Sequence, residues 1–354
     1  MRPAPVETSV YPDVVFFSRG RGRGHASNDL AVCRALRAMH QAVEVAFVSY
    51  DEGAKALKEA GENVVDLLLP EVNPFPETLV RCFEYLQGHG RPIVVAHEEL
   101  AALSAGRLAH CPTYFLTHWF PSPSDPYVQA LEHADGVLFM ERPGLFMEPK
   151  EVEGKVTYVG PIVREMSHRI SKEEAQKSLG LDRGEKLLLV LPGSWQESKA
   201  PIFELVTAAF AKLPDGKHLL WVAGRDYFAV KELAIGKADI TVIESHQQLE
   251  VPMIASDCVI TKGTYNVGRE LLSLGIPAIA LSNATNRIDD LYVRSFPNHK
   301  HLWTADIDAT GLSKAIREKW DGNHQRVGTS RSAQENGVES IAAVLQTILL
   351  GNAR

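Results

Sequence analysis

The sequence has few cysteines and no long apolar run, and these absences exclude several classes of protein. Its cysteines, Cys33, Cys82, Cys111 and Cys258, lie far apart among apolar neighbours. This excludes a disulfide framework and zinc-ligand spacing, and favours buried thiols. No apolar stretch of about eighteen residues is present, and residues 1–10 lack the basic start and apolar core of a secretion signal. We therefore expect a soluble, cytoplasmic protein without a transmembrane segment.

Basic residues are outnumbered by acidic ones. The net charge is -7, and the acidic excess lies within residues 1–160. A protein that binds nucleic acid or an anionic lipid surface usually carries a basic stripe that replaces phosphate counterions. Neither partner is favoured here, although the apolar loop 145–147 leaves peripheral contact with a membrane open.

Short apolar, β-branched runs alternate with segments of helical period along the whole chain. They lie at residues 14–18, 43–49, 93–97 and 114–118, and again at 187–191, 219–223, 240–243, 258–261 and 278–281. They lack polar alternation, as is typical of parallel strands covered by helices on both faces. The pattern restarts after Gly160, so we predict an α/β protein with two Rossmann-like domains whose parallel sheets face each other across a cleft.

The predicted domain borders follow from this restart. Residues 1–163 form an N-terminal domain, residues 164–335 a C-terminal domain, and residues 336–354 a closing helix with apolar residues at helical spacing. The spacing alone leaves open whether this helix covers the second sheet or returns to the first domain.

A Gly-rich loop follows the first predicted strand. A helix is expected from about Asp29, with Ser27 or Asn28 as its N-cap. Helix N-termini bind anions, so such a turn at the carboxyl edge of a sheet is a candidate substrate site. The glycine spacing differs from the dinucleotide and P-loop fingerprints, however, and Gly-rich turns often serve packing alone. His25, at the mouth of the loop, could take a proton from an attacking hydroxyl.

A second turn of this kind lies in the C-terminal half. Residues 258–261 are predicted as a strand, 262–266 as a turn and 267–274 as a helix that ends before Gly275. The N-terminus of this helix could hold a diphosphate. Glu270 could accept hydrogen bonds from two sugar hydroxyls, although taken alone it would be an ordinary solvated helix residue.

Four stretches resemble GT-B glycosyltransferases, above all the bacterial peptidoglycan N-acetylglucosaminyltransferase family and related UDP-sugar transferases. The stretches are residues 22–25, 159–164, 192–194 and 261–277, and the likeness spans nearly the full chain. The last stretch is the most specific. The resemblance implies a GT-B fold in which residues 1–163 form the acceptor side and residues 164–335 bind a nucleotide-sugar donor.

The resemblance also implies roles for individual residues. Gly22, Arg23 and Gly24 would line the acceptor side, with His25 near the reacting centre. Glu270 falls where the family keeps its ribose-binding glutamate. The other donor-binding residues that the resemblance implies are Ser194, Arg225, Ile243, Lys262, Gly263, Thr264, Tyr265 and Asn266.

Two departures from the family pattern concern the sugar and the acceptor. The polar segment with which the family reads the sugar appears here as residues 282–290, and the second Gly-rich acceptor loop is not recognisable. In its place stand His97 and Glu98, followed further on by His118, which could supply a base or contacts to the acceptor. The sugar and the acceptor therefore stay unidentified.

The resemblance implies a metal-independent, inverting transfer of a sugar from a nucleotide diphosphate sugar to an acceptor hydroxyl. It also implies that the donor is UDP-linked. We expect His25 to be the base, with His97, Glu98 or His118 as alternatives. Helix amides would stabilise the departing diphosphate, and no cofactor besides the donor substrate is expected. No metal site is expected either, because the one Asp-x-Asp segment, residues 306–308, precedes a helical run and suits a helix N-terminus.

Other functions compatible with this fold stay open. An epimerase-like enzyme or a phosphorylase could use the same architecture, but the epimerase signature Gly-Thr-Arg-Pro-Glu is missing. A non-catalytic nucleotide-sugar-binding protein would keep the donor turn and lose the base, and the presence of both His25 and Glu270 argues against it. A hydrolase is disfavoured because no Gly-x-Ser-x-Gly elbow occurs.

Overall fold

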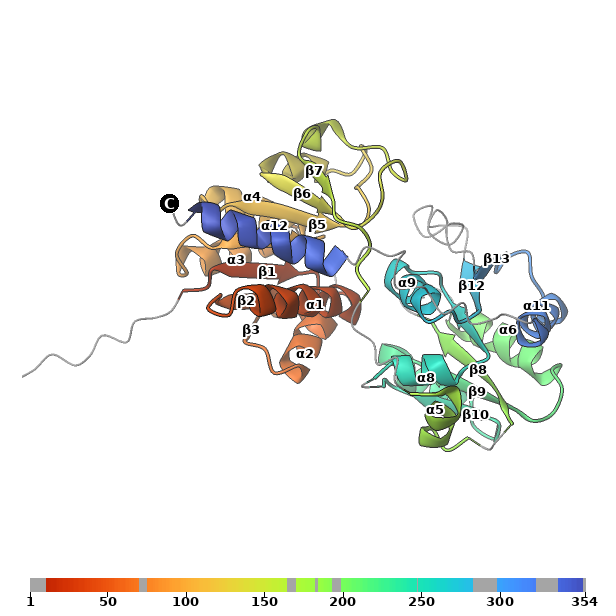
Figure 1. Ribbon diagram of the computed structural model, residues 1–354. Coiled ribbons are helices and arrows are strands. Elements are labelled where there is room, and N and C mark those ends of the chain that lie inside the picture. Colours follow the sequence, from red (N-terminus) through yellow and green to blue (C-terminus); the bar gives the residue numbers. More distant parts are fainter. Residues whose placement is uncertain are drawn as a thin grey trace, which may run out of the picture. The chain divides into compact units, whose positions relative to one another are not determined.

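Two parallel sheets organise the chain in the computed structural model, which describes residues 11–69, 75–163, 170–181, 184–192, 199–246, 248–282, 298–322 and 337–352 (Figure 1). The chain divides into two compact units, Met1–Arg164 with Gln334–Arg354, and Glu165–Ala333. Each unit is built on a parallel sheet with helices between its strands. The predicted α/β class, with two Rossmann-like sheets, is therefore confirmed.

The first unit holds a seven-stranded sheet with the order β3-β2-β1-β4-β5-β6-β7. Its strands are β1 (Val14–Ser18), β2 (Val45–Ser49), β3 (Val64–Asp66), β4 (Ile93–His97), β5 (Thr113–Thr117), β6 (Gly136–Phe139) and β7 (Val156–Tyr158). Its helices are α1 (Arg23–Met39), α2 (Asp51–Glu59), α3 (Phe75–Gln87), α4 (Leu100–Leu108) and α12 (Gly337–Asn352), with short 3₁₀ turns at Val128–His133 and Lys150–Val152. The order reverses between β1 and β4, which is the topological switch point where open α/β sheets bind ligands.

Alternate residues of the strands in this sheet face opposite layers of the core, as strand geometry requires. Val14 and Phe16 of β1 belong to the same apolar cluster as residues of α1 and α12. Val15 and Phe17 belong to the other cluster, with residues of α3 and α4. Both faces of β1 are therefore covered, which explains the continuous apolar run in its sequence.

The closing helix α12 belongs to the first unit, which decides between the two alternatives that the sequence left open. Its residues Val338, Ile341 and Leu345 are buried in the same cluster as Val14. At its start, the Gly337 amide donates a 3.0 Å hydrogen bond to the Pro161 carbonyl. A Cβ atom at Gly337 would lie 2.3 Å from the Gly160 carbonyl oxygen, so only glycine permits this approach.

We expect Leu345→Ala to lower the free energy of unfolding of the first unit by about 2–5 kcal/mol, because the substitution leaves a cavity under α12. The Leu345 side chain is fully buried. Leu350 lies on the same helix but is 56% exposed, so Leu350→Ala should cost less than about 0.5 kcal/mol. Urea titration followed by circular dichroism measures both, and equal small losses would contradict the packing of α12.

The second unit holds a six-stranded sheet with the order β10-β9-β8-β11-β12-β13. Its strands are β8 (Lys186–Leu191), β9 (Lys217–Val222), β10 (Ile240–Ile243), β11 (Cys258–Thr261), β12 (Ala278–Ser282) and β13 (His299–Trp303). Its helices include α5 (Lys172–Ser178), α6 (Lys199–Ala211), α7 (Tyr227–Leu233), α8 (Glu250–Ala255), α9 (Tyr265–Ser273) and α11 (Ala309–Asp321). The switch point here lies between β8 and β11, so the turn after β11 stands where such sheets bind ligands.

The Asp-x-Asp segment caps a helix, as predicted. Asp308 is the N-cap of α11, and its carboxylate accepts a 2.7 Å hydrogen bond from the Gly311 amide. This satisfies one of the amide donors that a helix N-terminus leaves free.

Candidate active site

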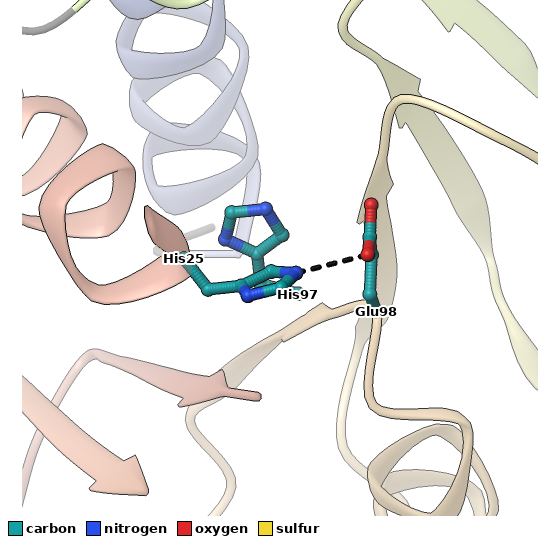
Figure 2. A group of neighbouring side chains, drawn as sticks. All are labelled: His25, His97 and Glu98. Atoms are coloured by element: carbon teal, nitrogen blue, oxygen red, sulfur yellow. Dashed lines mark hydrogen bonds and ion pairs between the residues drawn. The ribbon is translucent and has the colours of Figure 1, made fainter. Parts of the chain in front are cut away.

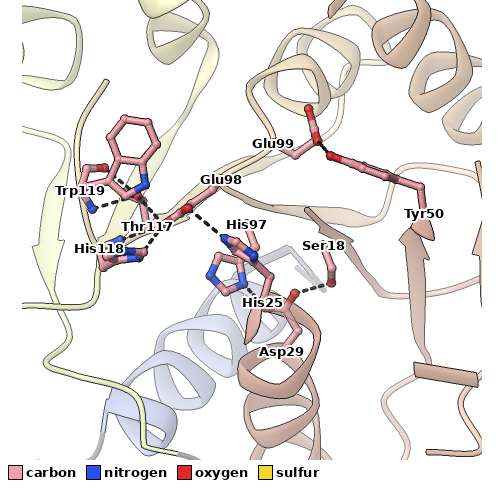
Figure 3. Close-up of polar contacts among 10 residues, drawn as sticks. All are labelled: Ser18, His25, Asp29, Tyr50, His97, Glu98, Glu99, Thr117, His118 and Trp119. Atoms are coloured by element: carbon pink, nitrogen blue, oxygen red, sulfur yellow. Dashed lines mark hydrogen bonds and ion pairs between the residues drawn. The ribbon is translucent and has the colours of Figure 1, made fainter. Parts of the chain in front are cut away.

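Polar side chains gather at the carboxyl ends of β1, β4 and β5 in the first unit. Ser18 pairs with His97 in the register of β1 and β4. Glu98 directly follows β4, and His118 follows β5, the next strand in the sheet. Because carboxyl ends of parallel strands meet at one edge, residues 18, 97–98 and 117–118 converge beside the switch point (Figure 3).

Helix α1 brings the side chains of His25 and Asp29 to this edge. The predicted start of this helix was wrong. The helix begins at Arg23, with Gly22 as its N-cap, rather than near Asp29 with Ser27 or Asn28 as the cap. His25 therefore lies in the first helical turn, and Asp29 lies one turn later on the same face. An N-cap propensity is a local signal, and the packing of α1 against the sheet outweighed it.

His25 and Glu98 form a hydrogen-bonded pair (Figure 2). The distance between His25 Nε2 and a Glu98 carboxylate oxygen is 2.9 Å, and the side chains are 21% and 3% exposed, respectively. Burial lowers the pKa of His25, and the Glu98 carboxylate opposes this shift only in part. His25 is therefore a neutral imidazole at neutral pH, able to accept a proton.

Glu98 is held from a second side as well. Its other carboxylate oxygen lies 2.6 Å from His118 Nδ1, and the Thr117 hydroxyl donates to it at 3.3 Å. Burial alone would raise the pKa of Glu98, but the imidazoles of His118 and His25 lower it well below its ordinary value. Glu98 is thus an ionised, buried carboxylate between two imidazoles.

The backbone of Glu98 is strained. Its φ angle is +54°, in the left-handed region that residues other than glycine rarely adopt. Such conformations cost on the order of 1 kcal/mol or more and cluster at functional sites. Here the turn that follows β4 carries the Glu98 carboxylate to His25.

A second histidine–carboxylate pair lies behind the first. His97 Nδ1 is 2.7 Å from an Asp29 carboxylate oxygen, and the two side chains are 1% and 0% exposed, respectively. The Ser18 hydroxyl donates a hydrogen bond to the other oxygen of Asp29. Burial alone would lower the pKa of His97, but its contact with Asp29 raises it above its ordinary value.

The two pairs meet through their rings. The centroids of His25 and His97 are 4.6 Å apart, and the ring planes are inclined by 74°. Sequence reasoning identified His25, His97, Glu98 and His118 but missed Asp29. The sequence did contain one signal for Asp29, because it lies four residues after His25. In a helix that begins at Arg23, two residues with this spacing lie on the same face.

His25, His97 and Glu98 also form a group that could hold a metal ion. Each offers one ligand atom, and these atoms lie within 4.8 Å of one another. Two imidazoles with a carboxylate suit zinc. The hydrogen bonds described above already satisfy both oxygens of Glu98 and Nδ1 of His97, so these groups have partners without an ion. Metal-independent transfer stays a prediction.

The Gly-rich loop itself is anchored by ion pairs within the first unit. Arg23 contacts Glu52 at 3.2 Å and Glu59 at 2.8 Å, and its side chain is 37% exposed. Gly22 has open space where a Cβ atom would stand. Contact of Gly22, Arg23 and Gly24 with an acceptor stays a prediction.

In the second unit, the predicted donor signature forms the turn after β11 and the helix α9. Gly263 has φ +86°, a conformation open to glycine, and its amide donates a 3.3 Å hydrogen bond to the Thr261 hydroxyl. Lys262 directly follows β11 and is the first residue of this turn. Thr264 is the N-cap of α9, but its side chain makes no capping hydrogen bond, and Tyr265 and Asn266 form the first turn of the helix.

Glu270 lies further along α9 and is 8% exposed, so it is a buried carboxylate rather than a solvated helix residue.

The remaining predicted donor residues lie at other strand ends. Ile243 ends β10 and is half-buried. Arg225 lies in the short 3₁₀ turn Gly224–Asp226 after β9, and its side chain is outside the described part of the chain. Ser194 follows β8 and also lies outside the described residues. Donor binding by these residues stays a prediction.

Comparison with known proteins supports the resemblance. No protein-family model matches the chain. The two units define the GT-B fold, which is shared by a solved structure described as the glycotransferase of kitacinnamycin, at TM-score 0.65 and 20% identity over 96% of this chain and 99% of that one. A UDP-N-acetylglucosamine–N-acetylmuramyl-(pentapeptide) pyrophosphoryl-undecaprenol N-acetylglucosamine transferase of Acetivibrio thermocellus is 22% identical over 329 residues, 86% of this chain and 85% of that protein. The resemblance to this group and the predicted GT-B fold are confirmed.

A different enzyme shares the same fold. The structure of a UDP-N-acetylglucosamine 2-epimerase from Listeria monocytogenes, described as putative, superposes at TM-score 0.67 with 14% identity, over 97% of each chain. At this identity the likeness extends to the fold only. The fold by itself therefore does not separate transfer from epimerisation.

Contact with a membrane has only local support. Within the residues that the structure describes, no helix combines the length and the apolarity needed to cross a membrane. In the loop 145–147, Met147 is 89% exposed, whereas the Phe146 ring packs edge-on against Phe139. Peripheral contact through this loop stays a prediction.

Proposed function

We propose that the protein is a metal-independent, inverting glycosyltransferase that uses a nucleotide diphosphate sugar, UDP-linked as in its relative. The observation that carries this proposal is the 2.9 Å hydrogen bond between His25 and the buried Glu98 beside the β1–β4 switch point. A neutral imidazole oriented by an ionised carboxylate is the arrangement that general-base catalysis requires. The named activities of the A. thermocellus relative and of the kitacinnamycin enzyme support the same class.

His25 would act through its Nδ1 atom. With Nε2–H donated to Glu98, Nδ1 is the ring nitrogen left to accept a proton. The acceptor hydroxyl would attack the anomeric carbon, the bond from that carbon to the diphosphate oxygen would break, and the hydroxyl proton would pass to Nδ1. Attack on the face opposite the leaving group inverts the anomeric centre.

The second unit would bind the donor. The turn at Gly263 and the first amides of α9 would stabilise the negative charge that develops on the departing diphosphate. Glu270 would accept hydrogen bonds from the two ribose hydroxyls, as its place in the family pattern implies. This division assigns the base to one unit and the donor to the other.

A screen of nucleotide sugars for thermal stabilisation tests the donor assignment, because a ligand that binds only the folded state raises the unfolding temperature. We expect a UDP-sugar to stabilise the protein more than the matching GDP- or CMP-sugar. Transfer is then tested by release of the nucleoside diphosphate in the presence of candidate acceptors. Release that depends on an acceptor supports a transferase, whereas turnover of the donor without an acceptor would favour the epimerase-like alternative.

Glu270→Ala should weaken binding of the UDP nucleotide about 10- to 100-fold, because a hydrogen bond to a charged group contributes roughly 1.5–3 kcal/mol. Isothermal titration calorimetry measures this. Alanine favours helices, so α9 should persist. Glu232→Ala, at an exposed glutamate of α7 in the same unit, is the matched control and should bind as the unmodified protein does. Unchanged affinity of the Glu270 variant would defeat the ribose assignment.

A further inference from the structure

The ligand atoms of His25, His97 and Glu98 lie close enough together to surround one metal ion. One such atom from each residue lies within 4.8 Å of the other two. The ligand atoms of a tetrahedral zinc ion stand roughly 3.4 Å apart, and the 2.9 Å contact between His25 Nε2 and Glu98 already brings two of them this close. The two rings are inclined by 74° rather than stacked, so their in-plane lone pairs can converge on one point after small side-chain rotations (Figure 2).

Contacts behind these three residues hold them as the ligands of a metal site are usually held. His97 Nδ1 lies 2.7 Å from the buried carboxylate of Asp29, so Nε2 is the nitrogen that His97 can offer to an ion. A histidine ligand typically bonds to a carboxylate through its other ring nitrogen in this way. Glu98 is held as well, because His118 Nδ1 lies 2.6 Å from one of its oxygens while the other oxygen faces His25 (Figure 3).

The three residues also differ in exposure, as the residues of an open metal site do. His97 and Glu98 are buried, whereas the His25 side chain is 21% exposed. An ion can therefore enter past His25, and water can fill its fourth position. Two imidazoles and one carboxylate with an open fourth position are the ligand set of one class of zinc site. Magnesium instead prefers a shell made of oxygen ligands.

We propose that this group binds Zn²⁺ and that the bound ion inhibits sugar transfer. Without the ion, the hydrogen bond between His25 Nε2 and Glu98 takes its place. When zinc binds, Nε2 loses its proton and bonds to the ion, and Nδ1 takes up a proton, so the ring stays neutral. Nδ1 then has no lone pair left to accept the proton of an acceptor hydroxyl. The inhibition rests on the proposed function, in which His25 is the base, but the binding of zinc does not.

Calorimetry with zinc chloride tests the binding on the full chain, freed of metal by a chelator and without substrate. We expect zinc to bind and magnesium chloride not to bind. His25→Gln removes a ligand at a partly exposed position, where the fold should tolerate it, and should weaken zinc binding by more than about 10-fold. Asp29→Asn keeps all three ligands but changes the support of His97. It should weaken binding about 10- to 100-fold, the usual cost of losing such a partner.

The matched control is His89→Gln. His89 is a partly buried histidine of the same unit, and its Nδ1 bonds to the Tyr85 carbonyl. This variant should bind zinc as the unmodified protein does. Circular dichroism checks the fold of each variant, and His25→Gln decides alone if Asp29→Asn does not fold. Equally strong zinc binding in His25→Gln, or no binding to the unmodified protein, would overturn the inference.

Cobalt reports the ligands by a second measurement. Co²⁺ with four ligands absorbs visible light far more strongly than hydrated, six-coordinate Co²⁺, so coordination geometry can be read from the spectrum. The strong bands should appear when the unmodified protein is titrated with cobalt chloride, and zinc should remove them. They should be lost in His25→Gln and in Glu98→Gln. Bands that neither substitution changes would place the ion elsewhere and contradict the proposed site.

Transfer assays separate this inference from the proposed function. Zinc should slow transfer over the concentration range in which calorimetry shows binding, and a chelator should restore the rate. If no transfer occurs under any condition, the proposed function fails while the binding result still stands. Transfer at the full rate with zinc bound would overturn the inferred inhibition, and the role of His25 as the base is then judged by the rate of His25→Ala alone.

Discussion

Replacement of His25 by alanine is expected to slow sugar transfer about 10²- to 10⁴-fold, the range over which a general base contributes. Donor binding should be retained, because His25 belongs to the first unit and the proposed donor residues to the second. Single-turnover rates with the donor identified by the thermal screen measure the chemical step, and calorimetry with UDP measures binding. The physical reason is that the acceptor hydroxyl would lose the ring nitrogen that is proposed to take its proton.

Two comparisons make this result specific. His89→Ala removes a partly buried histidine of the same unit without touching the site, and should leave transfer unchanged. Added imidazole should restore part of the rate to His25→Ala, because a small base can occupy the space left by the ring, and it should not accelerate the unmodified protein. Full activity of His25→Ala would transfer the base role to His118 or Glu98.

Glu98→Gln is expected to lower the maximal rate roughly 100-fold or more, because a glutamine amide can donate to Nε2 and so select the wrong tautomer of His25. The acidic limb should also move. The base must be neutral to act, so the rate rises with pH through the pKa of His25, which burial already holds below its ordinary value. Removing the Glu98 carboxylate takes away an interaction that raises this pKa, and the limb should move to lower pH.

The direction of that shift tests the pairing of Glu98 with His25. Glu98→Gln should move the acidic limb to lower pH, because it removes a negative charge beside His25. A profile of rate against pH from about 4.5 to 8.5 covers the acidic limb. Glu77→Gln, at a partly exposed glutamate on α3 that pairs with Arg81, is the matched control. An upward shift in Glu98→Gln would contradict the assignment of the carboxylate as the partner of the base.

Much of the fold was predictable from local pattern. The predicted strands 14–18, 93–97, 240–243 and 258–261 coincide with β1, β4, β10 and β11. Each is an apolar run bounded by polar or turn residues, and such runs in parallel sheets are buried on both faces, so their sequence signal is strong. The candidate site residues at the strand ends could be predicted as well, because the carboxyl ends of parallel strands share one edge of the sheet.

The helix borders and partners were less predictable. Ser27 and Asn28 are favourable caps, yet α1 begins at Arg23 and places them inside the helix. This shift of more than a turn brings His25 and Asp29 onto one face. Good and poor N-cap residues differ by about 1 kcal/mol in the stability they give a helix. The burial of α1 against the sheet contributes more free energy than this.

By itself, the sequence determined the alternation of strands and helices, the two sheets, and which side chains stand at the strand ends, because these depend on the polarity of neighbours along the chain. Only the tertiary structure decided that Asp29 bonds to His97, that Glu98 lies between His25 and His118, and that α12 packs in the first unit. These contacts join residues far apart in the chain, and strand order and register bring them together. No local pattern encodes that order, because it depends on which packing of all the elements buries the most apolar surface.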